Sequence, residues 1–386
     1  PADIMTGSDR PAGPAGDSPV SPPASAALET GLRTQPGVRG AVYWIGAAVA
    51  VLHLVMNFTT WFSTQWQATL HFVGLGVLCV LLYPVRRSEK VAASRAWLAT
   101  DLIIGGLCLA AALWIVAAED LIYSRGVNMT PWEQGLAVVT ILGAVELTRR
   151  TTGWIIPSLI VLALSYVTWW GAGLDNVFRF AGLSVETVLF RSIYGDDALF
   201  GSIARISVSF VFMFILFGAF LLRSGAGDFV ILMARALAGR IVGGPGLVAV
   251  ISSGLTGTIS GSSIANTVST GVITIPMMKR AGFPARFAAG VESAASTGGQ
   301  LMPPIMGAGA FVMASYTQIP YGTIVAVSFI PALLYFLSII FYVRIEAQRL
   351  GLVRLEKDPQ SVWTVSYTHL RAHETNESIS YAVFCL

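Results

Sequence analysis

The chain has 386 residues, of which 54% are hydrophobic and only 12% are charged, with a net charge of +3 and a mean hydropathy of +0.69. Soluble domains carry about 25% charged residues, so this composition excludes an ordinary soluble protein and points to a membrane. No basic block suited to nucleic acid is present. The three cysteines form no CxxC or Cys/His pattern, which argues against a zinc site or a disulfide framework.

The first 151 residues are predicted to form a disordered segment followed by four plain spans. Residues 1–40 are rich in Pro, Ala, Ser and Gly, and they lack the charged-then-apolar order of a signal peptide. A bilayer core of about 30 Å needs about 20 mostly apolar residues per helix. Runs of this kind lie at 41–58, 68–85, 97–118 and 134–149. We therefore expect a four-helix membrane domain over 41–151.

A second membrane domain is expected over 152–364. Ordinary apolar runs in it lie at 154–171, 203–222 and 322–343. The charged stretch 172–202 predicts an amphipathic helix at the outer surface. Two further stretches, 245–276 and 287–315, are hydrophobic but interrupted by Gly, Ser, Thr and Pro. The predicted fold class is an all-α polytopic membrane protein with about eight spanning helices and one re-entrant helical hairpin.

The distribution of Lys and Arg tests this arrangement, because the positive-inside rule places them on the cytoplasmic side. With the amino terminus in the cytoplasm, the inner connections are rich in basic residues. The outer connections hold only Arg125, Arg179, Arg191 and Arg205. This alternation requires 245–276 to enter and leave on the cytoplasmic side. It therefore predicts a re-entrant hairpin over 243–278, followed by a broken helix over 287–315 that crosses fully.

The predicted hairpin contains an irregular run of small and polar residues, Gly254-Leu-Thr-Gly-Thr-Ile-Ser-Gly-Ser-Ser-Ile-Ala-Asn-Thr. Irregular backbone at membrane depth is tolerated only around a cavity or a buried site. Carbonyls, hydroxyls and the amide of Asn266 suit a monovalent cation such as Na⁺, whereas the absence of carboxylates argues against Ca²⁺ or Mg²⁺. The alternative is close helix packing through small residues, which by itself needs neither Asn266 nor so many hydroxyls.

A second polar break follows in the run Glu292-Ser-Ala-Ala-Ser-Thr-Gly-Gly-Gln-Leu-Met-Pro-Pro. The glycine pair permits unusual backbone angles and the proline pair removes two helix donors, so the helix is expected to unwind at 297–303. Discontinuous helices near the membrane midplane indicate a secondary transporter. Glu292 is the main acidic candidate inside a span. A coupling role for it competes with a salt bridge to Arg286 or an interfacial position.

Other isolated polar residues carry weaker signals. His53 and His71 lie in the first two spans without a partner carboxylate, so packed or interfacial histidines are expected. Asp101 and Glu146 lie near cytoplasmic span ends, where solvation or pairing with nearby arginines, Arg95 and Arg149, is expected. No GxSxG, HExxH or P-loop motif is present, so the chain is not expected to be an enzyme and no catalytic residue is assigned.

Two segments carry a family resemblance, the run from Gly254 to Thr267 and Ser296-Thr-Gly-Gly-Gln-Leu-Met-Pro-Pro-Ile. They resemble the large membrane subunit of the TRAP transporters, the tripartite ATP-independent periplasmic transporters, and the TAXI-type branch is the most similar. In that branch a four-helix small subunit is often fused ahead of the large one. The four spans before Thr151 match such an arrangement, and the resemblance covers roughly 40–360.

The resemblance implies a Na⁺-driven symporter in the bacterial inner membrane, with a cytoplasmic amino terminus and an elevator-like movement. Small organic acids would be delivered by a periplasmic binding protein, and no cofactor is implied beyond the coupling ion. By motif matching, the residues near Na⁺ would be Ser260, Ser262, Ser263, Asn266, Thr297, Gly298, Gly299 and Gln300. Weaker candidates for substrate binding or coupling are Glu292, Thr267, Pro303 and Pro304.

The sequence departs from the family in its last part. A full large subunit carries two inverted repeats, each with its own hairpin, whereas here one hairpin and one broken helix are followed by a single span. Residues 365–386 are expected to be a non-native tail, because Ser366-Tyr-Thr-His-Leu-Arg-Ala-His-Glu-Thr resembles a translated sequencing adapter. We therefore expect a carboxy-terminally truncated transporter half that does not transport alone.

Two other protein classes are weighed against the transporter. Another ion-coupled transporter or a channel-like protein with a re-entrant filter would share the irregular hairpin, and a channel would show passive flux instead of Na⁺-dependent accumulation. A membrane-embedded enzyme would need an acidic or histidine cluster at the interface, and the pair Asp196–Asp197 is its only candidate.

Overall fold

The computed structural model describes residues 32–33, 35–86, 88, 91–92, 94–126, 128–175, 177–238 and 241–352. Every regular element among these residues is a helix, and six of the helices are long and apolar enough to cross a membrane. These are Pro36–Phe58, Thr64–Leu82, Arg95–Ala117, Ile155–Gly173, Ser202–Leu221 and Tyr321–Arg349. The predicted all-α polytopic class is thus confirmed. Residues 1–31 and 365–386 lie outside the described residues, and the predictions for them stay predictions.

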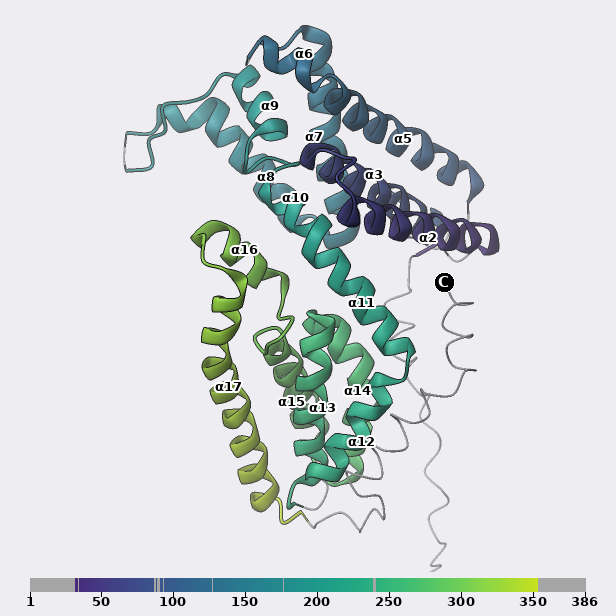
Figure 1. Cartoon of the computed structure of the whole chain (residues 1–386), viewed down its shortest axis with the longest axis vertical. Helices are drawn as coiled ribbons and strands as arrows, with labels where there is room; N and C mark the ends of the chain where they lie inside the picture. The colour runs from purple at the N-terminus through teal and green to yellow at the C-terminus, as the bar shows by residue number, and fades with distance from the viewer. Residues whose placement is uncertain are drawn as a thin grey trace, which may run out of the picture. The chain divides into compact units, whose positions relative to one another are not determined.

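Four helices occupy the stretch of the predicted four-helix domain (Figure 1): α2 (Pro36–Phe58), α3 (Thr64–Leu82), α5 (Arg95–Ala117) and α7 (Pro131–Thr152). They pack in chain order, α2 on α3, α3 on α5 and α5 on α7. Residues 36–40, predicted as disordered, are helical. Pro36 favours a helix start because its fixed φ is already helical and its missing amide needs no partner there. α7 begins with a capping box of Thr130 and Glu133 and ends before Gly153, which has a φ of 85°.

Buried charges tie the ends of these helices together. Asp101 on α5 forms an ion pair with Arg150 on α7 (2.9 Å), and its other oxygen accepts a hydrogen bond from Arg33, which precedes α2. All three side chains are at most 2% exposed. Arg33 also donates to the carbonyl of Val80 on α3, at 2.8 Å. The cluster therefore joins the segment before α2 to helices α3, α5 and α7.

This geometry corrects one expected pairing. Asp101 is neither solvated nor paired with Arg95, because six residues separate the two on one helix and they point to different sides. Glu146 does pair with Arg149, at 2.6 Å, and it also contacts Arg150, at 2.8 Å.

The segment after α7 is more irregular. α8 (Ile155–Ser165) continues as a π-helical turn over Tyr166–Trp170 and a 3-10 turn over Gly171–Gly173. In the charged stretch 172–202, the predicted surface helix is shorter than expected and is limited to α9 (Val185–Tyr194). One face of α9 is buried against α3, α5, α7 and the short helix α6 (Glu119–Ser124). The apolar face and charged ends of α9 fit the predicted amphipathic character.

A broken helix follows and contacts the first two spans. It consists of α10 (Ser202–Ile206), a π-helical turn (Ser207–Val211) and α11 (Phe212–Arg223). His53 and His71 are buried and lie 2.7 Å apart between Nε2 and Nδ1. The second ring is also 2.9 Å from the Ser207 hydroxyl. The histidines are thus packed, as expected, and they are partners of each other.

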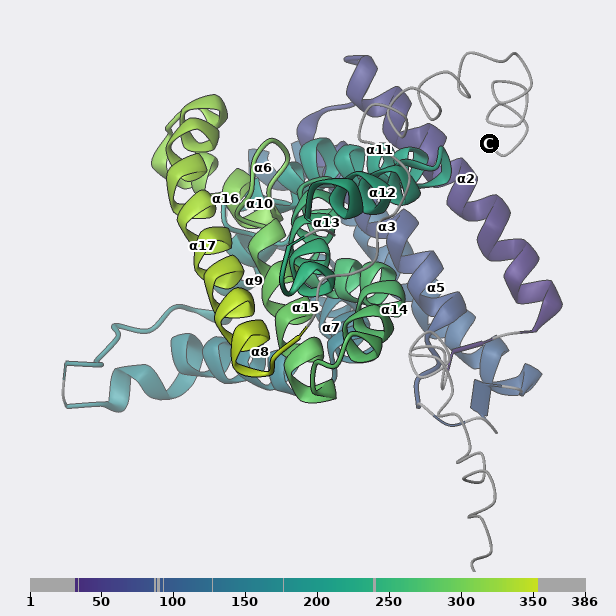
Figure 2. The ribbon, with the colours of Figure 1, turned by 90° about the horizontal axis from the view of Figure 1, so that it is seen from below.

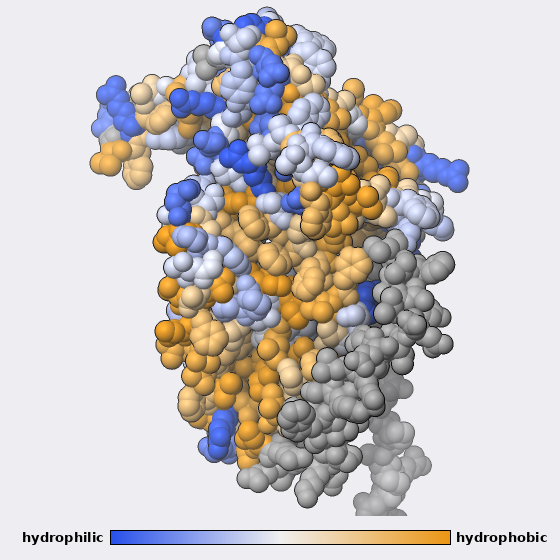
Figure 3. All heavy atoms as spheres, in the orientation of Figure 1, coloured by the Kyte–Doolittle hydropathy of each residue, from blue (hydrophilic) through white to orange (hydrophobic). Residues whose placement is uncertain are grey.

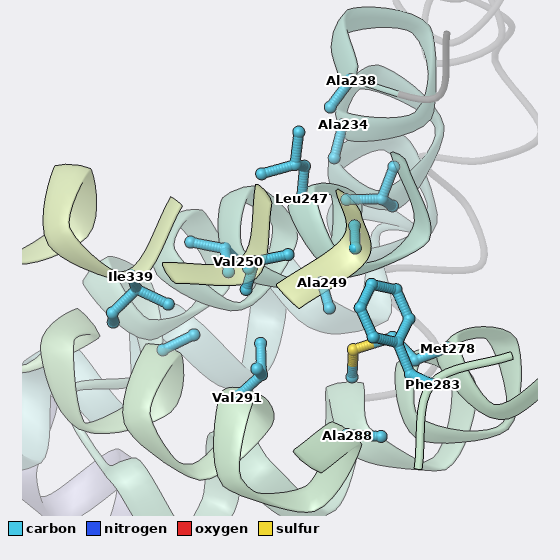
Figure 4. Close-up of a cluster of buried hydrophobic side chains, with 14 of the residues drawn as sticks. Ala234, Ala238, Leu247, Ala249, Val250, Met278, Phe283, Ala288, Val291 and Ile339 are labelled. Carbon is cyan, nitrogen blue, oxygen red and sulfur yellow. The ribbon is translucent and has the colours of Figure 1, made fainter. Parts of the chain in front are cut away.

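The remaining helices are α12 (Ala226–Ala238), α13 (Gly244–Ser260), α14 (Ser263–Arg280), α15 (Ala285–Gly299), α16 (Ala308–Thr317) and α17 (Tyr321–Arg349). All of them except α16 contribute side chains to the second core of the described chain. α13 packs on α12, α14, α15 and α17, and α14 and α17 lie on opposite sides of α15 (Figure 2). Figure 4 shows the apolar side chains that fill this core, among them Leu247, Val250, Met278, Val291 and Ile339.

The contacts at one end of this core bring three chain positions together. A side chain added at Gly246 would meet Val343 of α17 and Phe283, which lies between α14 and α15. The start of α13, the connection from α14 to α15 and the end of α17 therefore lie at the same end, as the predicted hairpin requires. The outward face of α17 is apolar (Figure 3), with Leu334 and Phe341 more than half exposed, which suits contact with lipid.

The buried charge cluster generates a stability prediction. We expect Asp101→Asn to lower the free energy of unfolding by about 3–5 kcal/mol, because Arg33 and Arg150 would stay buried without their shared carboxylate. The measurement is thermal or denaturant unfolding of the protein in detergent. Glu346→Gln is the matched control, since its partner Arg349 is 78% exposed and the pair is long at 3.6 Å. Equal stability of the two variants would show that the cluster contributes nothing.

Candidate functional site

The predicted helical hairpin is formed by α13 and α14. They are joined by Gly261, whose φ of 61° is the left-handed conformation that reverses the chain. Ser262 then caps α14, with its hydroxyl accepting from the amide of Ala265 at 3.3 Å. The hairpin boundaries agree with the predicted 243–278 to within two residues. Its insertion into a membrane stays a prediction.

The predicted helix break lies between α15 and α16. α15 extends through Gly299, and the non-helical segment covers 300–307, so the break begins three residues later than the predicted 297–303. The reason is packing. Gly298 lies directly against Tyr335 and Phe336 of α17, and the helix continues through this close contact because glycine has no side chain. Within the break, the amide of Gly307 donates to the carbonyl of Gln300 at 2.8 Å.

The end of α13 and the end of α15 touch through their backbones. A Cβ atom added to Gly257 would lie 2.7 Å from the Cα atom of Gly299, which is closer than any side chain tolerates. One turn further, a Cβ atom at Gly261 would lie 2.8 Å from the carbonyl oxygen of Met306 in the break. The hairpin tip is therefore held directly against the unwound segment.

Four helix ends meet at this contact. The carboxyl ends of α13 and α15 present carbonyl groups, and the amino ends of α14 and α16 present amide groups. The groups at such helix ends lack partners within their own helix. Helix dipoles make the first pair of ends partly negative and the second pair partly positive. The place where tip and break meet can thus attract a cation and an anion side by side.

A polar layer lies one turn below the glycine contact. The amide nitrogen of Asn266 donates to the carbonyl of Ser253 at 2.7 Å, to the hydroxyl of Ser253 at 2.9 Å and to that of Ser296 at 3.1 Å. Asn266 is fully buried, and its Oδ1 atom has no hydrogen-bond partner in the described part of the chain. A flipped amide would place Oδ1 against the Ser253 carbonyl, so the orientation is fixed. Asn266 therefore retains one unsatisfied buried oxygen, which suits a cation.

Glu292 lies in the next layer, fully buried among hydroxyl groups. Its carboxylate accepts hydrogen bonds from the hydroxyls of Ser253 (2.9 Å), Ser296 (3.2 Å), Thr274 (2.5 Å) and Thr270. The salt bridge considered for it is wrong, because Arg286 is exposed and no salt bridge to Glu292 exists among the residues with defined positions. The interfacial position considered for it stays a prediction.

The candidate residues for Na⁺ are brought together in part. Ser260, Ser262 and Ser263 lie half-buried at the hairpin tip, and Asn266, Gly298 and Gly299 are buried at the contact with α15. Gln300 begins the break, and Pro303 and Pro304 lie within it. Thr267 follows Asn266 and is half-buried. Thr297 is different: it is exposed and its hydroxyl donates to the carbonyl of Ser293, at 2.8 Å, on its own helix. Roles of these residues in binding Na⁺ stay predictions.

Four further polar residues belong to the site and were not singled out from the sequence. They are Ser253, Thr270, Thr274 and Ser296. The signal was spacing: Asn266, Thr270 and Thr274 recur every four residues on α14, and Ser296 follows Glu292 by four residues on α15. Side chains at that spacing share one helix face.

Comparison with known proteins gives a family for most of this region. Residues 139–375, more than half of the chain, match the family model described as "Tripartite ATP-independent periplasmic transporter, DctM component". The chain is 32% identical over 169 residues to the C4-dicarboxylate TRAP transporter large permease protein DctM of Rhodobacter capsulatus, which covers 44% of this chain and 34% of that protein. It is 33% identical over 153 residues to the protein of the same name from Pseudomonas aeruginosa, covering 40% and 35%. The chain thus matches about a third of the length of these curated relatives.

The glycine contact generates a packing prediction. We expect Gly257→Ala to destabilise the protein by about 1–3 kcal/mol, because the new methyl group would force the backbones of α13 and α15 apart. Gly290→Ala on α15 is the matched control, since an added Cβ atom there meets nothing within 4 Å. It should be neutral or stabilising, as alanine is the better helix former. Thermal unfolding in detergent compares the two, and an unchanged midpoint for Gly257→Ala would contradict the contact.

Proposed function

Because the chain belongs to the DctM component family of the tripartite ATP-independent periplasmic (TRAP) transporters, we propose that it is the permease component of a Na⁺-coupled secondary transporter. It takes up small organic acids, with C4-dicarboxylates as the first candidates, from a periplasmic binding protein. It lies in the bacterial inner membrane with its amino terminus in the cytoplasm. The names of the relatives support the substrate class, and the arginine distribution supports the orientation.

The family match confirms two predictions made from the sequence. The resemblance to TRAP permeases is correct, and the chain is a multi-pass membrane transporter component, not an enzyme. The TAXI-type branch, the fused small subunit and the domain boundaries stay predictions.

The observation that carries the proposal is the meeting of four helix ends at the hairpin tip. Transport of a carboxylate together with a cation needs adjacent places for opposite charges inside the membrane. The carboxyl ends of α13 and α15 supply the partly negative place, and the amino ends of α14 and α16 supply the partly positive one. Discontinuous helices arranged in this way bind ions and substrates in secondary transporters.

The unsatisfied oxygen of Asn266 supports Na⁺ as the coupling ion. A small hard cation prefers neutral and charged oxygen ligands, and Oδ1 of Asn266 is a buried oxygen that nothing else in the described chain satisfies. The half-buried hydroxyls of Ser260, Ser262 and Ser263 lie at the same end of the hairpin. We assign these oxygens to Na⁺ and the amide groups of the facing helix ends to a substrate carboxylate.

Direct ion binding tests the coupling ion. We expect the purified chain in lipid nanodiscs to bind ²²Na⁺ saturably and in preference to K⁺. Asn266→Ala should weaken binding by about tenfold or more, since it removes a ligand oxygen from a site that water does not reach. Asn57→Ala is the control. The Asn57 amide donates to the carbonyls of His53 and Val208, which lie outside the helices α12 to α17. Equal Na⁺ and K⁺ binding, or none, would contradict the proposal.

Linkage between ion and substrate tests the substrate class. We expect a saturating C4-dicarboxylate to raise the affinity for Na⁺, and Na⁺ to raise the affinity for the dicarboxylate by the same factor. A monocarboxylate of similar size serves as the control and should have a smaller effect. Passive Na⁺ flux through vesicles containing the chain, without any linkage, would support the channel-like alternative instead.

A further inference from the structure

The carboxylate of Glu292 has no positively charged partner among the residues that the structure describes. The side chain is 0% exposed and every group that donates to it is a neutral hydroxyl. A buried carboxylate without a counter-charge is costly, so its charge must be balanced by a bound cation or removed by a proton.

The charged residues of the surrounding helices do not reach Glu292. α13 carries none. On α14 the charges are Lys279 and Arg280, both exposed at its far end, and on α15 the other charge is Arg286, also exposed. The charges of α17 lie at the end that contacts the start of α13. No charged side chain of these helices lies next to Glu292, so within the described residues the balancing charge is left to a bound cation or a proton.

The hydrogen bonds around Glu292 have a defined direction. A carboxylate can only accept, so the hydroxyl hydrogens of Ser253 and Ser296 run toward Glu292 and their oxygens are left to accept from Asn266. The two hydroxyl oxygens are 2.8 Å apart, but each hydroxyl has one hydrogen, so with both hydrogens on the carboxylate neither donates to the other. Both amide hydrogens of Asn266 are thereby used, and its Oδ1 atom is left as the free acceptor.

We propose that Glu292 is the positioning residue of the cation site at Asn266 and supplies that site's negative charge from one layer away. The inference rests on the proposed Na⁺ coupling. Glu292 does not itself bind the ion; it holds the Asn266 oxygen in place through Ser253 and Ser296. Its charge, in surroundings of low dielectric constant, attracts the cation across the hydroxyl layer.

Glu292→Gln separates this role from a structural one. The glutamine oxygen can accept from Ser253, Thr270 and Ser296 as before. The glutamine amide can donate to Thr274, whose own hydrogen then goes to the Thr270 carbonyl at 3.0 Å. The hydroxyl groups around residue 292 therefore keep their hydrogen bonds while the charge is lost. We expect Na⁺ affinity to fall about 10–100-fold, the usual effect of changing a residue behind a metal ligand, with no loss of thermal stability in Na⁺-free buffer.

A charge-retaining variant and a control sharpen the test. Glu292→Asp keeps the negative charge on a side chain one methylene shorter and should retain Na⁺ binding to within about tenfold of the wild type. Glu119→Gln removes a carboxylate of α6, outside this helix group, and should leave Na⁺ affinity unchanged. All variants are compared by ²²Na⁺ binding to the purified chain in nanodiscs and by thermal unfolding without Na⁺.

The possible results distinguish failure of the role proposed for Glu292 from failure of the proposed Na⁺ coupling. If the wild type binds Na⁺ and Glu292→Gln binds it equally well, the charge of Glu292 does not contribute to the site, and this inference is overturned while the proposed function stands. A Glu292→Gln variant that unfolds at lower temperature without Na⁺ would also overturn it, since the residue would then be structural. If the wild type binds no Na⁺, the proposed function fails and this inference fails with it.

Discussion

The backbone contact between Gly257 and Gly299 is the constraint on which the candidate site depends. Because neither residue has a side chain, α13 and α15 approach until a single methyl group would not fit between them. That approach carries the hairpin tip onto the unwound segment and brings four helix ends to one place. It also closes the polar layers below, in which Asn266 and Glu292 are both completely buried. The close packing of α13 and α15 thus brings the residues of the site together before any ligand binds.

Much of this arrangement could be predicted from the sequence, because charge and composition act over whole segments. The alternation of basic connections predicted that one hydrophobic stretch folds back on itself, and α13 and α14 are that hairpin. The glycine and proline pairs predicted a helix break. Its position was three residues off, because the contact of Gly298 with α17 keeps the backbone helical there. Such a contact joins residues about 40 positions apart and leaves no local signal.

The residues of the candidate site could likewise be predicted only in part. Asn266 and Glu292 stood out because a polar group at membrane depth is unusual. Their partners did not, because serine and threonine in a helix usually donate to their own backbone, as Thr297 does here. Only the packing of three helices shows that Ser253, Thr270 and Ser296 turn inward to one carboxylate. Thr297 has the right residue type in the right motif, yet it faces outward.

The two buried histidines link three parts of the chain that are distant in sequence. The Nδ1 atom of His53 lies 2.7 Å from the Val49 carbonyl and must donate to it, which fixes the hydrogens of both rings and makes Ser207 the donor to His71. This chain of hydrogen bonds links α2, α3 and the π-helical turn that leads into α11. The hairpin meets α11 at Gly218, where an added Cβ atom would lie 3.3 Å from the Ile259 carbonyl oxygen. A side chain at Gly218 would press on the end of α13, so this glycine sets how closely α11 and the hairpin approach.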